Sequence, residues 1–306
     1  MITPLQAQSA DAVRRHYDDL SDVYREIWGD HLHHGYWRTG KENQRAAVEA
    51  LVDLVAEQLQ ISSGQAIGDI GCGYGAAAQH LAEHHDIAVT GLTISRKQAH
   101  VAAAIQPTAG SVNILERDWL ANGLSDGCFD GAYAIESTEH IADKQAFFDE
   151  AWRTLRPEGR LVVCAWLADN DPSSFSIRHL LEPICREGRL PGMGSRNEYE
   201  KMAGTAGFSL ISFTDLSGNV ARTWPICMRR LLVKFLTDGR YCAMIFDPAL
   251  EDRIFLRTVP RLMIALQTGA MRYGIFAWRR ESGSMDIKVP ASTASIGTRT
   301  ECNPSP

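Results

Sequence analysis

The sequence lacks the patterns that several classes of protein require. Its seven cysteines are scattered and include no CxxC pair, which argues against a disulfide framework or a cysteine zinc site and favours reduced thiols. No apolar run approaches the roughly 18 residues of a membrane-spanning helix, and the N-terminal segment lacks a signal-peptide core. We therefore expect a cytoplasmic protein, with peripheral membrane contact left open. The net charge of −6 gives no reason to expect nucleic acid as a partner.

A regular alternation of strand and helix patterns begins at residue 67. Strands are expected at 67–70, 87–91, 112–115, 130–135 and 160–166, and later at "SLISFTDLS" and "MRYGIFAWRRE". Segments with apolar residues at helical spacing separate the earlier strands. Such alternation is typical of a parallel sheet that is covered by helices on both faces. The sequence thus predicts an α/β fold with a Rossmann-like, doubly wound, mainly parallel sheet of seven strands.

The remaining segments divide the chain into a cap, a core with an insert, and a tail. Residues 1–60 contain two helical patterns interrupted by "HLHHGYW" and are expected to form a helical lid. Residues 61–281 form the core, with a helical insert near 218–268 before the last strand. Residues 282–306 are rich in Ser, Thr, Gly and Pro, which predicts a disordered tail. The N-terminal helix could also join the subunits of a homo-oligomer.

A glycine cluster follows the first expected strand. In "DIGCGYG", Asp69 ends the strand, and Gly71, Gly73 and Gly75 occupy every second position before a helix. Glycine lets the backbone turn tightly and approach a ligand, and the start of the helix offers unpaired N–H groups. The spacing G-x-G-x-G does not match the G-x-G-x-x-G of a dinucleotide site. By itself the cluster leaves a plain turn, a dinucleotide site and a methyl-donor site open.

This cluster resembles the D-x-G-C-G-x-G motif of class I S-adenosylmethionine-dependent methyltransferases. The resemblance implies that the glycine turn binds the methionine part of S-adenosyl-L-methionine, the expected cofactor. Gly68 and Ala76 depart from the family pattern, which usually has a bulky apolar residue and a further glycine there. A nicotinamide oxidoreductase is disfavoured, because the third glycine and a ribose-binding carboxylate after the second strand are missing.

Two further segments resemble cofactor motifs of the subgroup that contains tocopherol methyltransferases. "GLTISRKQ" resembles G-[LI]-T-[LI]-S-x-x-Q, which implies polar cofactor contacts from Thr93 and Gln98. Ser95 and Gln98 also have the spacing of a helix capping box, and the two roles are compatible. "ERDWL" implies an adenine contact from Asp118 and stacking from Trp119, with a solvated loop carboxylate as the alternative.

The end of the fourth strand carries the expected reaction chemistry. "ESTEHIADK" resembles the "ESxEHxxDK" segment of the same subgroup. Ligands of open α/β sheets lie beyond the carboxyl ends of the strands, so Glu136, Glu139 and His140 are expected at the mouth of the site. His140 is the predicted general base, because an unperturbed pKa of about 6.5 suits proton removal from a hydroxyl near neutral pH. A purely structural histidine is the alternative.

The segment "HYDDLSDVYREIWGDHLHHGYW" resembles the N-terminal cap of the subgroup. The resemblance implies that Tyr17 and Tyr36 lie over the carboxylate and sulfonium of the cofactor, and that Trp28 and Trp37 line the acceptor pocket. Aromatic faces suit a sulfonium cation. A lid is expected because water in the site would compete as a nucleophile.

The histidines of the cap and the cations of the insert have alternative interpretations. The spacing of His31, His33 and His34 does not match a tetrahedral zinc motif, so we expect packing and hydrogen bonding in the lid and no metal. In the insert, "LSGNVARTWP" resembles the subgroup and places Trp224 among the acceptor-binding residues, although its apolar positions also fit ordinary core. A basic cluster could meet an anionic acceptor or a membrane surface, or could be a solvated helix face; it comprises Arg222, Arg229, Arg230 and Lys234.

The motifs together predict a methyltransferase that acts on a small, mainly apolar acceptor such as an isoprenoid, an aromatic compound or another natural product. With His140 as base, O-methylation is favoured. The alternative within the class is C-methylation of a prenyl double bond or phenolic ring, with Glu136 or Glu139 and aromatic residues stabilising the cation. An alternative of another class is a non-catalytic module that binds S-adenosylmethionine.

Overall fold

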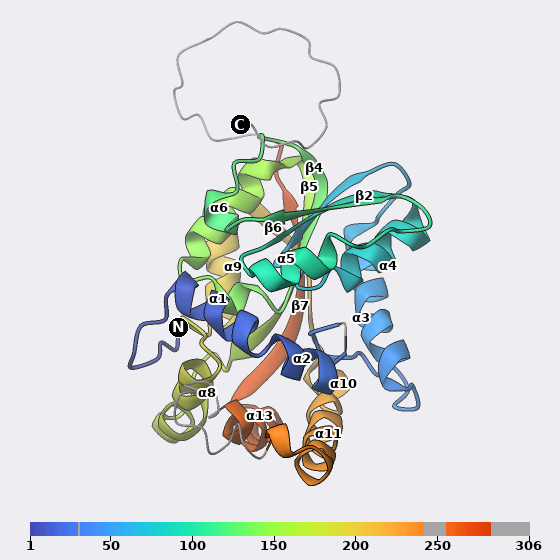
Figure 1. Ribbon diagram of the computed structural model, residues 1–306. Coiled ribbons are helices and arrows are strands. Elements are labelled where there is room, and N and C mark those ends of the chain that lie inside the picture. Colours follow the sequence, from blue (N-terminus) through green and yellow to red (C-terminus); the bar gives the residue numbers. More distant parts are fainter. Residues whose placement is uncertain (30, 242–254, 283–306) are drawn as a thin grey trace, which may run out of the picture.

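The structure, a computed structural model, describes residues 1–29, 31–241 and 255–282 (Figure 1). Its strands are β1 (Ala66–Ile70), β2 (Ala88–Thr93), β3 (Ser111–Glu116), β4 (Phe129–Ile135), β5 (Leu155–Ala168), β6 (Phe208–Asp215) and β7 (Met271–Arg280). They form one seven-stranded sheet in the order β3-β2-β1-β4-β5-β7-β6. Neighbours from β3 to β5 are parallel, and β7 is antiparallel to both β5 and β6. The predicted fold class is confirmed. The predicted tail from 283 onward and residues 242–254 of the insert lie outside the described residues.

The fifth strand is longer than the sequence indicates. We expected it over 160–166, whereas β5 begins at Leu155. Its pairing with β4 shifts register between Phe129 and Gly131, and Glu158 has a φ of 65°. Leu155 pairs with Phe129 before this irregularity, which explains how the strand continues across a segment that contains Pro157 and Gly159.

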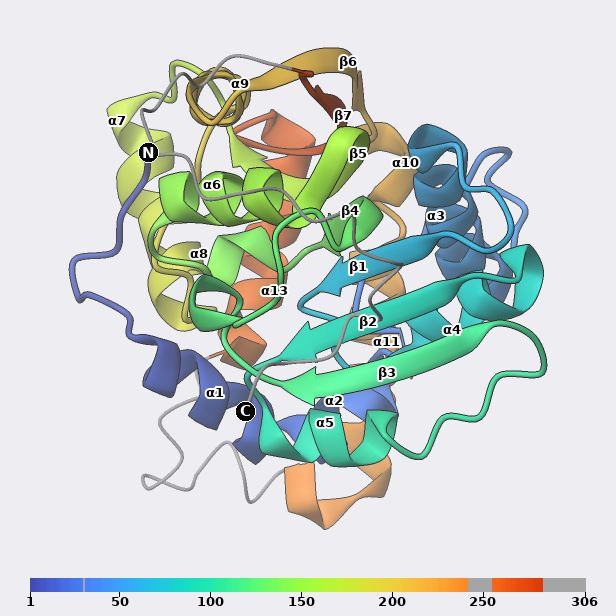
Figure 2. The same ribbon diagram turned by 90° about the horizontal axis from the view of Figure 1, so that it is seen from above.

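Helices cover both faces of the sheet (Figure 2). On one face, α3 (Gln44–Leu59) and α4 (Ala76–His85) bury apolar side chains against β1, β2 and β4. On the other face lie α6 (Lys144–Thr154) and α9 (Arg196–Thr205), whose Phe147, Phe148 and Tyr199 are fully buried. A capping box formed by Ser195 and Glu198 starts α9. Burial on both sides fixes the register of the central strands and hence the positions of the loops that follow them.

The N-terminal cap consists of α1 (Ala10–Asp19), α2 (Ser21–Ile27) and the irregular segment 31–37. The first of the two helical patterns expected within residues 1–60 is divided into two helices, because the backbone leaves helical geometry at Leu20 (φ −93°, ψ 6°). Leu20 itself is buried. The break divides this part of the cap into two short helices (Figure 1).

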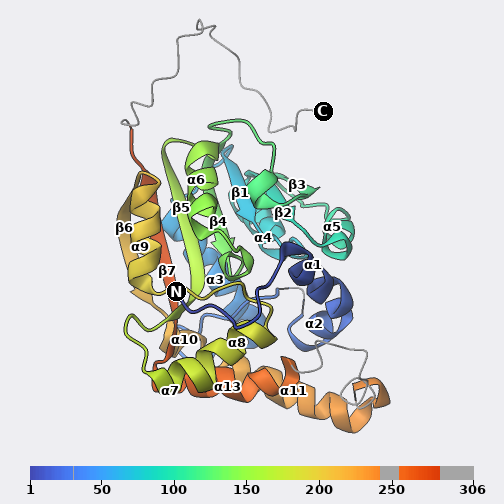
Figure 3. The ribbon, with the colours of Figure 1, turned by 90° about the vertical axis from the view of Figure 1, so that its left-hand side faces the viewer.

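A layer of helices closes the same end of the sheet as the cap (Figure 3). It contains α7 (Ser174–Ser176), the π-helical turn η3 (Ile177–Leu181), α8 (Glu182–Glu187), α10 (Ser217–Val220), α11 (Thr223–Thr237) and α13 (Phe255–Thr268). Leu181, Ile184, Trp224 and Leu262 pack together inside this layer. Within the described ranges, no helix combines the length and apolarity needed to cross a membrane.

Candidate active site

The largest part of the site is a cavity of about 200 Å³ at the carboxyl ends of β1, β2 and β4, which we call the donor cavity. The glycine turn forms its floor. A Cβ on Gly71 would lie 2.3 Å from the Cβ of Ser137, so a side chain is excluded there by the fourth-strand loop. A Cβ on Gly73 would meet nothing within 4 Å. Because Gly73 lines the cavity with φ +55°, its bare backbone is open to a ligand.

Asp69 lies at the end of β1 beneath this turn. It is 3% exposed, and its Oδ2 accepts a hydrogen bond from the Tyr133 hydroxyl at 2.7 Å. Burial raises the pKa of Asp69 to about 7, although the Tyr133 bond opposes this shift. A donor group on a bound ligand would therefore find a carboxyl with unused acceptor capacity at the cavity wall.

The second strand ends in a polar pair that faces the cavity. The Thr93 hydroxyl donates to Gln98 Oε1 at 2.8 Å, and both residues are buried and line the donor cavity. Ser95 Oγ accepts from the Gln98 N–H and caps α5 (Arg96–Ala102). The capping interaction is thus one-sided, because the Gln98 side chain pairs with Thr93 instead of returning to the Ser95 N–H. The capping alternative is present in this one-sided form, and the cofactor contacts of Thr93 and Gln98 stay a prediction.

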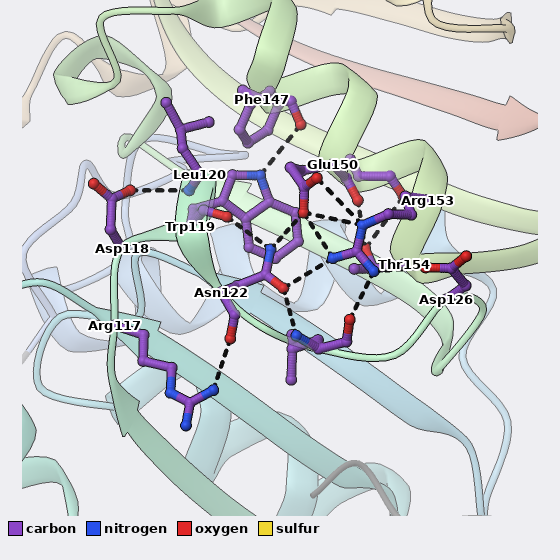
Figure 4. A network of polar contacts seen from close by, with 12 residues as sticks. Arg117, Asp118, Trp119, Leu120, Asn122, Asp126, Phe147, Glu150, Arg153 and Thr154 are labelled. Atoms are coloured by element: carbon purple, nitrogen blue, oxygen red, sulfur yellow. Dashed lines mark hydrogen bonds and ion pairs between the residues drawn. The ribbon is translucent and has the colours of Figure 1, made fainter. Parts of the chain in front are cut away.

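The third-strand loop brings Asp118 and Trp119 to the cavity in different ways (Figure 4). Asp118 is exposed, and its Oδ1 accepts from the Leu120 N–H at 2.9 Å at the start of the 3₁₀ turn η1 (Trp119–Ala121). The Trp119 indole is 3% exposed and donates to the Phe147 carbonyl at 3.2 Å. Trp119 therefore contributes to the cavity wall while it is anchored in the core.

Asn122, which no sequence motif singled out, holds this loop in place (Figure 4). Its Nδ2 donates to the Trp119 carbonyl at 2.7 Å and to Glu150 Oε2 at 2.8 Å. Its Oδ1 accepts from Arg153 at 3.0 Å and from the Leu124 N–H at 2.8 Å. Asn122 is 1% exposed, so this fully used amide fixes the loop against α6.

Two contacts dock the cap onto the donor-cavity loops. Asp18 Oδ1 accepts from Ser95 Oγ at 2.6 Å, which joins α1 to the start of α5. The Tyr74 hydroxyl, within the glycine motif, is 2.6 Å from Ser21 Oγ and donates to the Ser21 carbonyl at 3.1 Å. Cap position and glycine-turn position are therefore coupled. Tyr74 was not among the predicted site residues.

The irregular cap segment places different residues at the cavity from those predicted. His31, Leu32 and His33 line the donor cavity, whereas Tyr36 and Trp37 line neither this cavity nor the acceptor cavity described below. The Tyr36 N–H donates to the Ala47 carbonyl, so the chain runs along α3 at this point. Trp37 is 3% exposed and donates to the Glu42 carbonyl at 3.1 Å. Neither Tyr36 nor Trp37 therefore lies at the cavity where it was expected.

His31 and His33 form a short chain that ends on the backbone. His31 Nδ1 is 3.1 Å from His33 Nε2, and His33 Nδ1 donates to the His34 carbonyl at 2.8 Å. Burial and the neighbouring His33 lower the pKa of His31 to about 3, and burial lowers that of His33. Both rings are thus neutral near pH 7 and suit a wall beside a cationic ligand.

A second cavity of about 60 Å³, the acceptor cavity, adjoins the first. Tyr17, Leu32, Glu136 and His140 line both cavities and form their boundary. The acceptor cavity is otherwise mainly apolar and aromatic; its walls include the predicted Trp28 and Trp224, and also Trp166, Ile184, Leu190 and Leu262. Trp166 lies near the carboxyl end of β5, where the rule for open sheets places ligands, and this signal could have identified it.

At the boundary, the Tyr17 hydroxyl and His140 Nε2 are 2.7 Å apart. Burial raises the pKa of Tyr17, so its hydroxyl keeps its proton at neutral pH and donates to the imidazole. Burial, together with His16 and Lys144, lowers the pKa of His140 to about 3. His140 Nδ1 is buried and has no hydrogen-bond partner among the described residues. The Arg189 backbone opposes the lowering of the His140 pKa but does not outweigh it. This pair ties α1 to the fourth-strand loop.

Glu136 is held by four donors. Oε1 accepts from the His34 N–H at 2.7 Å and the Tyr273 hydroxyl at 2.8 Å, and Oε2 contacts His34 Nδ1 at 2.9 Å and Trp166 Nε1 at 3.0 Å. Burial alone would raise the pKa of Glu136, but His34 and His33 outweigh it and lower the pKa to about 2. Glu136 is therefore an ionised, fully used carboxylate between the two cavities.

Glu139 has the opposite character. Its Oε1 accepts from the Trp166 N–H, and burial together with the charge of Glu136 raises its pKa to about 7. The buried Lys144 lies near it, and burial lowers the pKa of Lys144 to about 8. Glu139 lines the acceptor cavity. Two carboxyl groups of one loop thus have pKa values on opposite sides of the ordinary one, because only Glu136 has a histidine partner.

The basic cluster of the insert is largely committed to the cap. Arg230 donates to the Ile27 carbonyl at 2.7 Å, Lys234 pairs with Glu26, and Arg222 donates to the Gly40 carbonyl. These contacts hold α2 and the segment after it against α11. Three of the four cations, for which the sequence left an anionic acceptor, a membrane surface and a solvated face open, therefore fasten the lid in this structure.

Comparison with known proteins identifies the family. The profile of the mycolic acid cyclopropane synthetase family matches residues 5–234. The chain belongs to this family. It is 31% identical over 233 residues to the probable chloroplastic tocopherol O-methyltransferase of Oryza sativa subsp. japonica, a match that covers 71% of this chain and spans 64% of that relative. It is 32% identical over 231 residues to the O-methyltransferase resE of Aspergillus sclerotiorum, covering 73% of this chain and 84% of that protein.

The fold of this family member is also that of a solved enzyme. The mycolic acid cyclopropane synthase CmaA1, in a crystal structure complexed with SAH and CTAB, superposes with a TM-score of 0.78 at 22% identity, over 90% of this chain and 99% of that one. Members of the cyclopropane synthetase family use S-adenosylmethionine, and this chain is an S-adenosylmethionine-dependent methyltransferase that acts on small molecules, as the motifs predicted.

The donor cavity fits the family's cosubstrate. The open face of Gly73 would admit the methionine part close to the backbone. The predicted cofactor residues that line this cavity are Tyr17, Asp69, Gly71, Gly73, Thr93, Gln98, Asp118 and Trp119. Gly75 does not line it; this residue is the N-cap of α4, and its Cβ position is 2.7 Å from Ile105 Cδ1, so its constraint is packing. When bound, S-adenosylmethionine supplies a methyl group activated by a sulfonium.

Proposed function

We propose that this enzyme O-methylates a hydroxyl of a small, mainly apolar acceptor, with a buried histidine taking the proton. The observation that supports the proposal most directly is the pair of adjoining cavities, one open at the glycine turn and one lined by three tryptophans. The boundary between them carries neutral and acidic side chains and no Lys or Arg. This arrangement suits an uncharged acceptor better than a phosphate or carboxylate compound.

The chain's own residues would position the acceptor and exclude water. The cap covers the donor cavity through Tyr17 and Asp18, so closing the lid brings the boundary residues together. The aromatic walls bury an apolar body, and the two cavities share one edge where acceptor and donor would meet. His140 lies on that edge, and its role as the base stays a prediction.

The test is a product analysis with the purified full chain. Wild-type enzyme and S-adenosylmethionine are incubated with a panel of phenols and prenyl alcohols, S-adenosylhomocysteine is quantified, and products are examined by NMR. We expect an O–CH₃ product. S-adenosylhomocysteine binding without turnover of any acceptor in the panel would instead favour a non-catalytic binding module.

C-methylation is the second candidate, and the aromatic wall favours it. Trp28, Trp166 and Trp224 line one small cavity, where the rings of Trp28 and Trp166 each pack edge to face with that of Trp224, and these aromatic rings could stabilise a carbocation. Glu139 would then accept the departing proton, since it is the carboxyl that lines this cavity without a histidine partner. A C–CH₃ signal in the same NMR analysis would select this reaction over O-methylation.

A further inference from the structure

His34 combines a fixed orientation with an unused ring nitrogen. It is 2% exposed, and its Nδ1 lies 2.9 Å from Glu136 Oε2. Because an ionised carboxylate can only accept, Nδ1 carries the proton in the neutral ring and Nε2 carries the lone pair. Nε2 is buried and has no hydrogen-bond partner among the described residues. A lone pair of this kind, on a residue that lines the acceptor cavity, requires an explanation.

Glu136, the hydrogen-bond partner of His34, is held in one orientation by several contacts. Glu136 has a φ of 53°, a left-handed backbone conformation that is costly for a side chain of its type. Four hydrogen bonds from His34, Trp166 and Tyr273 compensate for it. The low pKa of Glu136, about 2, keeps the carboxylate charged over the whole neutral range. Such a carboxylate orients an imidazole and stabilises the imidazolium that forms when Nε2 takes a proton.

A second buried polar atom without a partner in the described part of the chain belongs to Trp224, whose ring packs against that of His34. Trp224 is 1% exposed, its Nε1 has no hydrogen-bond partner among the described residues, and its ring centroid is 5.1 Å from that of His34. Both residues line the acceptor cavity. One atom is an acceptor and the other a donor, which is the complement of a hydroxyl group. A ligand hydroxyl would satisfy both buried atoms together.

His140 is less suited to remove a proton. Its Nε2 is already occupied by the Tyr17 hydroxyl, and its pKa of about 3 makes it a weak acceptor. The Tyr17–His140 pair accounts for that histidine by closing the lid. His34 has no comparable structural bond at Nε2.

We propose that His34, oriented by Glu136, is the general base that takes the proton from the acceptor hydroxyl; the inference rests on the proposed O-methylation. The O–H bond breaks and its proton moves to Nε2. The electron pair on oxygen forms the new O–CH₃ bond as the S–CH₃ bond breaks, and that electron pair stays on sulfur. Glu136 is a positioning residue, because it acts through His34.

The test compares His34→Gln with His140→Gln on two phenols of different acidity. The glutamine amide of H34Q can still donate to Glu136 but cannot take a proton. With 4-methylphenol, we expect kcat of H34Q to fall by about 100-fold or more, as for other lost general bases. With 4-nitrophenol, which is ionised in mildly alkaline buffer, the loss should shrink to less than about 10-fold, because no proton has to be removed. Glu136→Gln should lower kcat for 4-methylphenol with little change in KM.

Calorimetric binding of S-adenosylhomocysteine shows that the variants are folded. An independent measurement is a structure of the wild type with S-adenosylhomocysteine and 4-methylphenol, in which the phenol oxygen should lie within about 3.2 Å of His34 Nε2. A phenol oxygen bound elsewhere, or normal turnover of 4-methylphenol by H34Q, would overturn the role of His34 while leaving O-methylation intact. A C–CH₃ product from the wild type would overturn the proposed function itself and the role of His34 with it.

Discussion

Two glycines of the donor turn should respond differently to the same substitution. In Gly71→Ala, the new methyl group would lie 2.3 Å from Ser137 Cβ, in a residue with φ +82°. The left-handed backbone costs about 1–2 kcal/mol and overpacking about 1–3 kcal/mol, for a sum of about 2–5 kcal/mol. In Gly73→Ala the methyl meets no protein atom within 4 Å, so only the backbone cost of about 1–2 kcal/mol applies.

For ligand binding we expect the opposite order, with the larger effect at Gly73. The Gly73 methyl group would occupy the space that we assign to S-adenosylmethionine, and overpacking of about 1–3 kcal/mol corresponds to about 5–150-fold weaker binding. Gly64→Ala is a matched control, because Gly64 also has a positive φ (+79°), meets nothing within 4 Å and lies outside the donor cavity.

Thermal unfolding and calorimetry measure the two effects. At about 2 °C per kcal/mol, Tm should fall by about 4–10 °C in G71A and by about 2–4 °C in G73A and G64A. G73A should lose affinity for S-adenosylhomocysteine, whereas G64A should not. Equal affinities of G73A and G64A would refute the placement of the ligand against Gly73.

Three further perturbations follow from the donor cavity and the cap. Because burial raises the pKa of Asp69 to about 7, its contribution to stability is present below about pH 4 and is lost as the pH rises through 7. In urea unfolding, the free energy of unfolding of Asp69→Asn should therefore rise by about 3 kcal/mol relative to that of the wild type as the pH goes from about 5 to 8. A difference between the two proteins that does not change with pH would contradict this. Asn122→Ala removes four hydrogen bonds, two of which satisfy the Trp119 carbonyl and the Leu124 N–H of buried residues, so it should lose about 3 kcal/mol or more in the same assay, and a loss below about 1 kcal/mol would count against the network. Tyr17→Phe removes the bond to His140 and should weaken S-adenosylhomocysteine binding by about 5–150-fold. Tyr24→Phe, which loses a bond to His16 inside the cap, should leave binding nearly unchanged. Equal effects of the two substitutions would argue that the Tyr17–His140 bond does not hold the lid closed.

The sequence was sufficient for the donor half of the site because its residues follow strand ends within short motifs. Asp69, Thr93 and Asp118 each lie within two residues of the end of a parallel strand, so the sheet itself brings them together. The cap segment had no such rule. Whether Leu32 or Tyr36 faces the cavity depends on contacts with distant residues, such as the bond from the Tyr36 N–H to the Ala47 carbonyl. The expectation for Tyr36 and Trp37 came from the family resemblance alone, and neither residue lines the cavity at which it was expected.

The acceptor half shows a deeper limit of sequence patterns. Its polar pairs join residues that are far apart in the chain: His34 bonds to Glu136 across 102 positions, and Tyr17 to His140 across 123. The sequence cannot distinguish a histidine that fastens the lid, as we infer for His140, from one that acts as a base, as we propose for His34. In the structure the two differ in which ring nitrogen has a hydrogen-bond partner. The motif "ESTEH" drew attention to His140 because it contains that residue, whereas the structure uses the same motif to supply Glu136 to His34. Under the role that we propose for His34, the motif marks the loop that orients the base, while the proton acceptor itself comes from the cap.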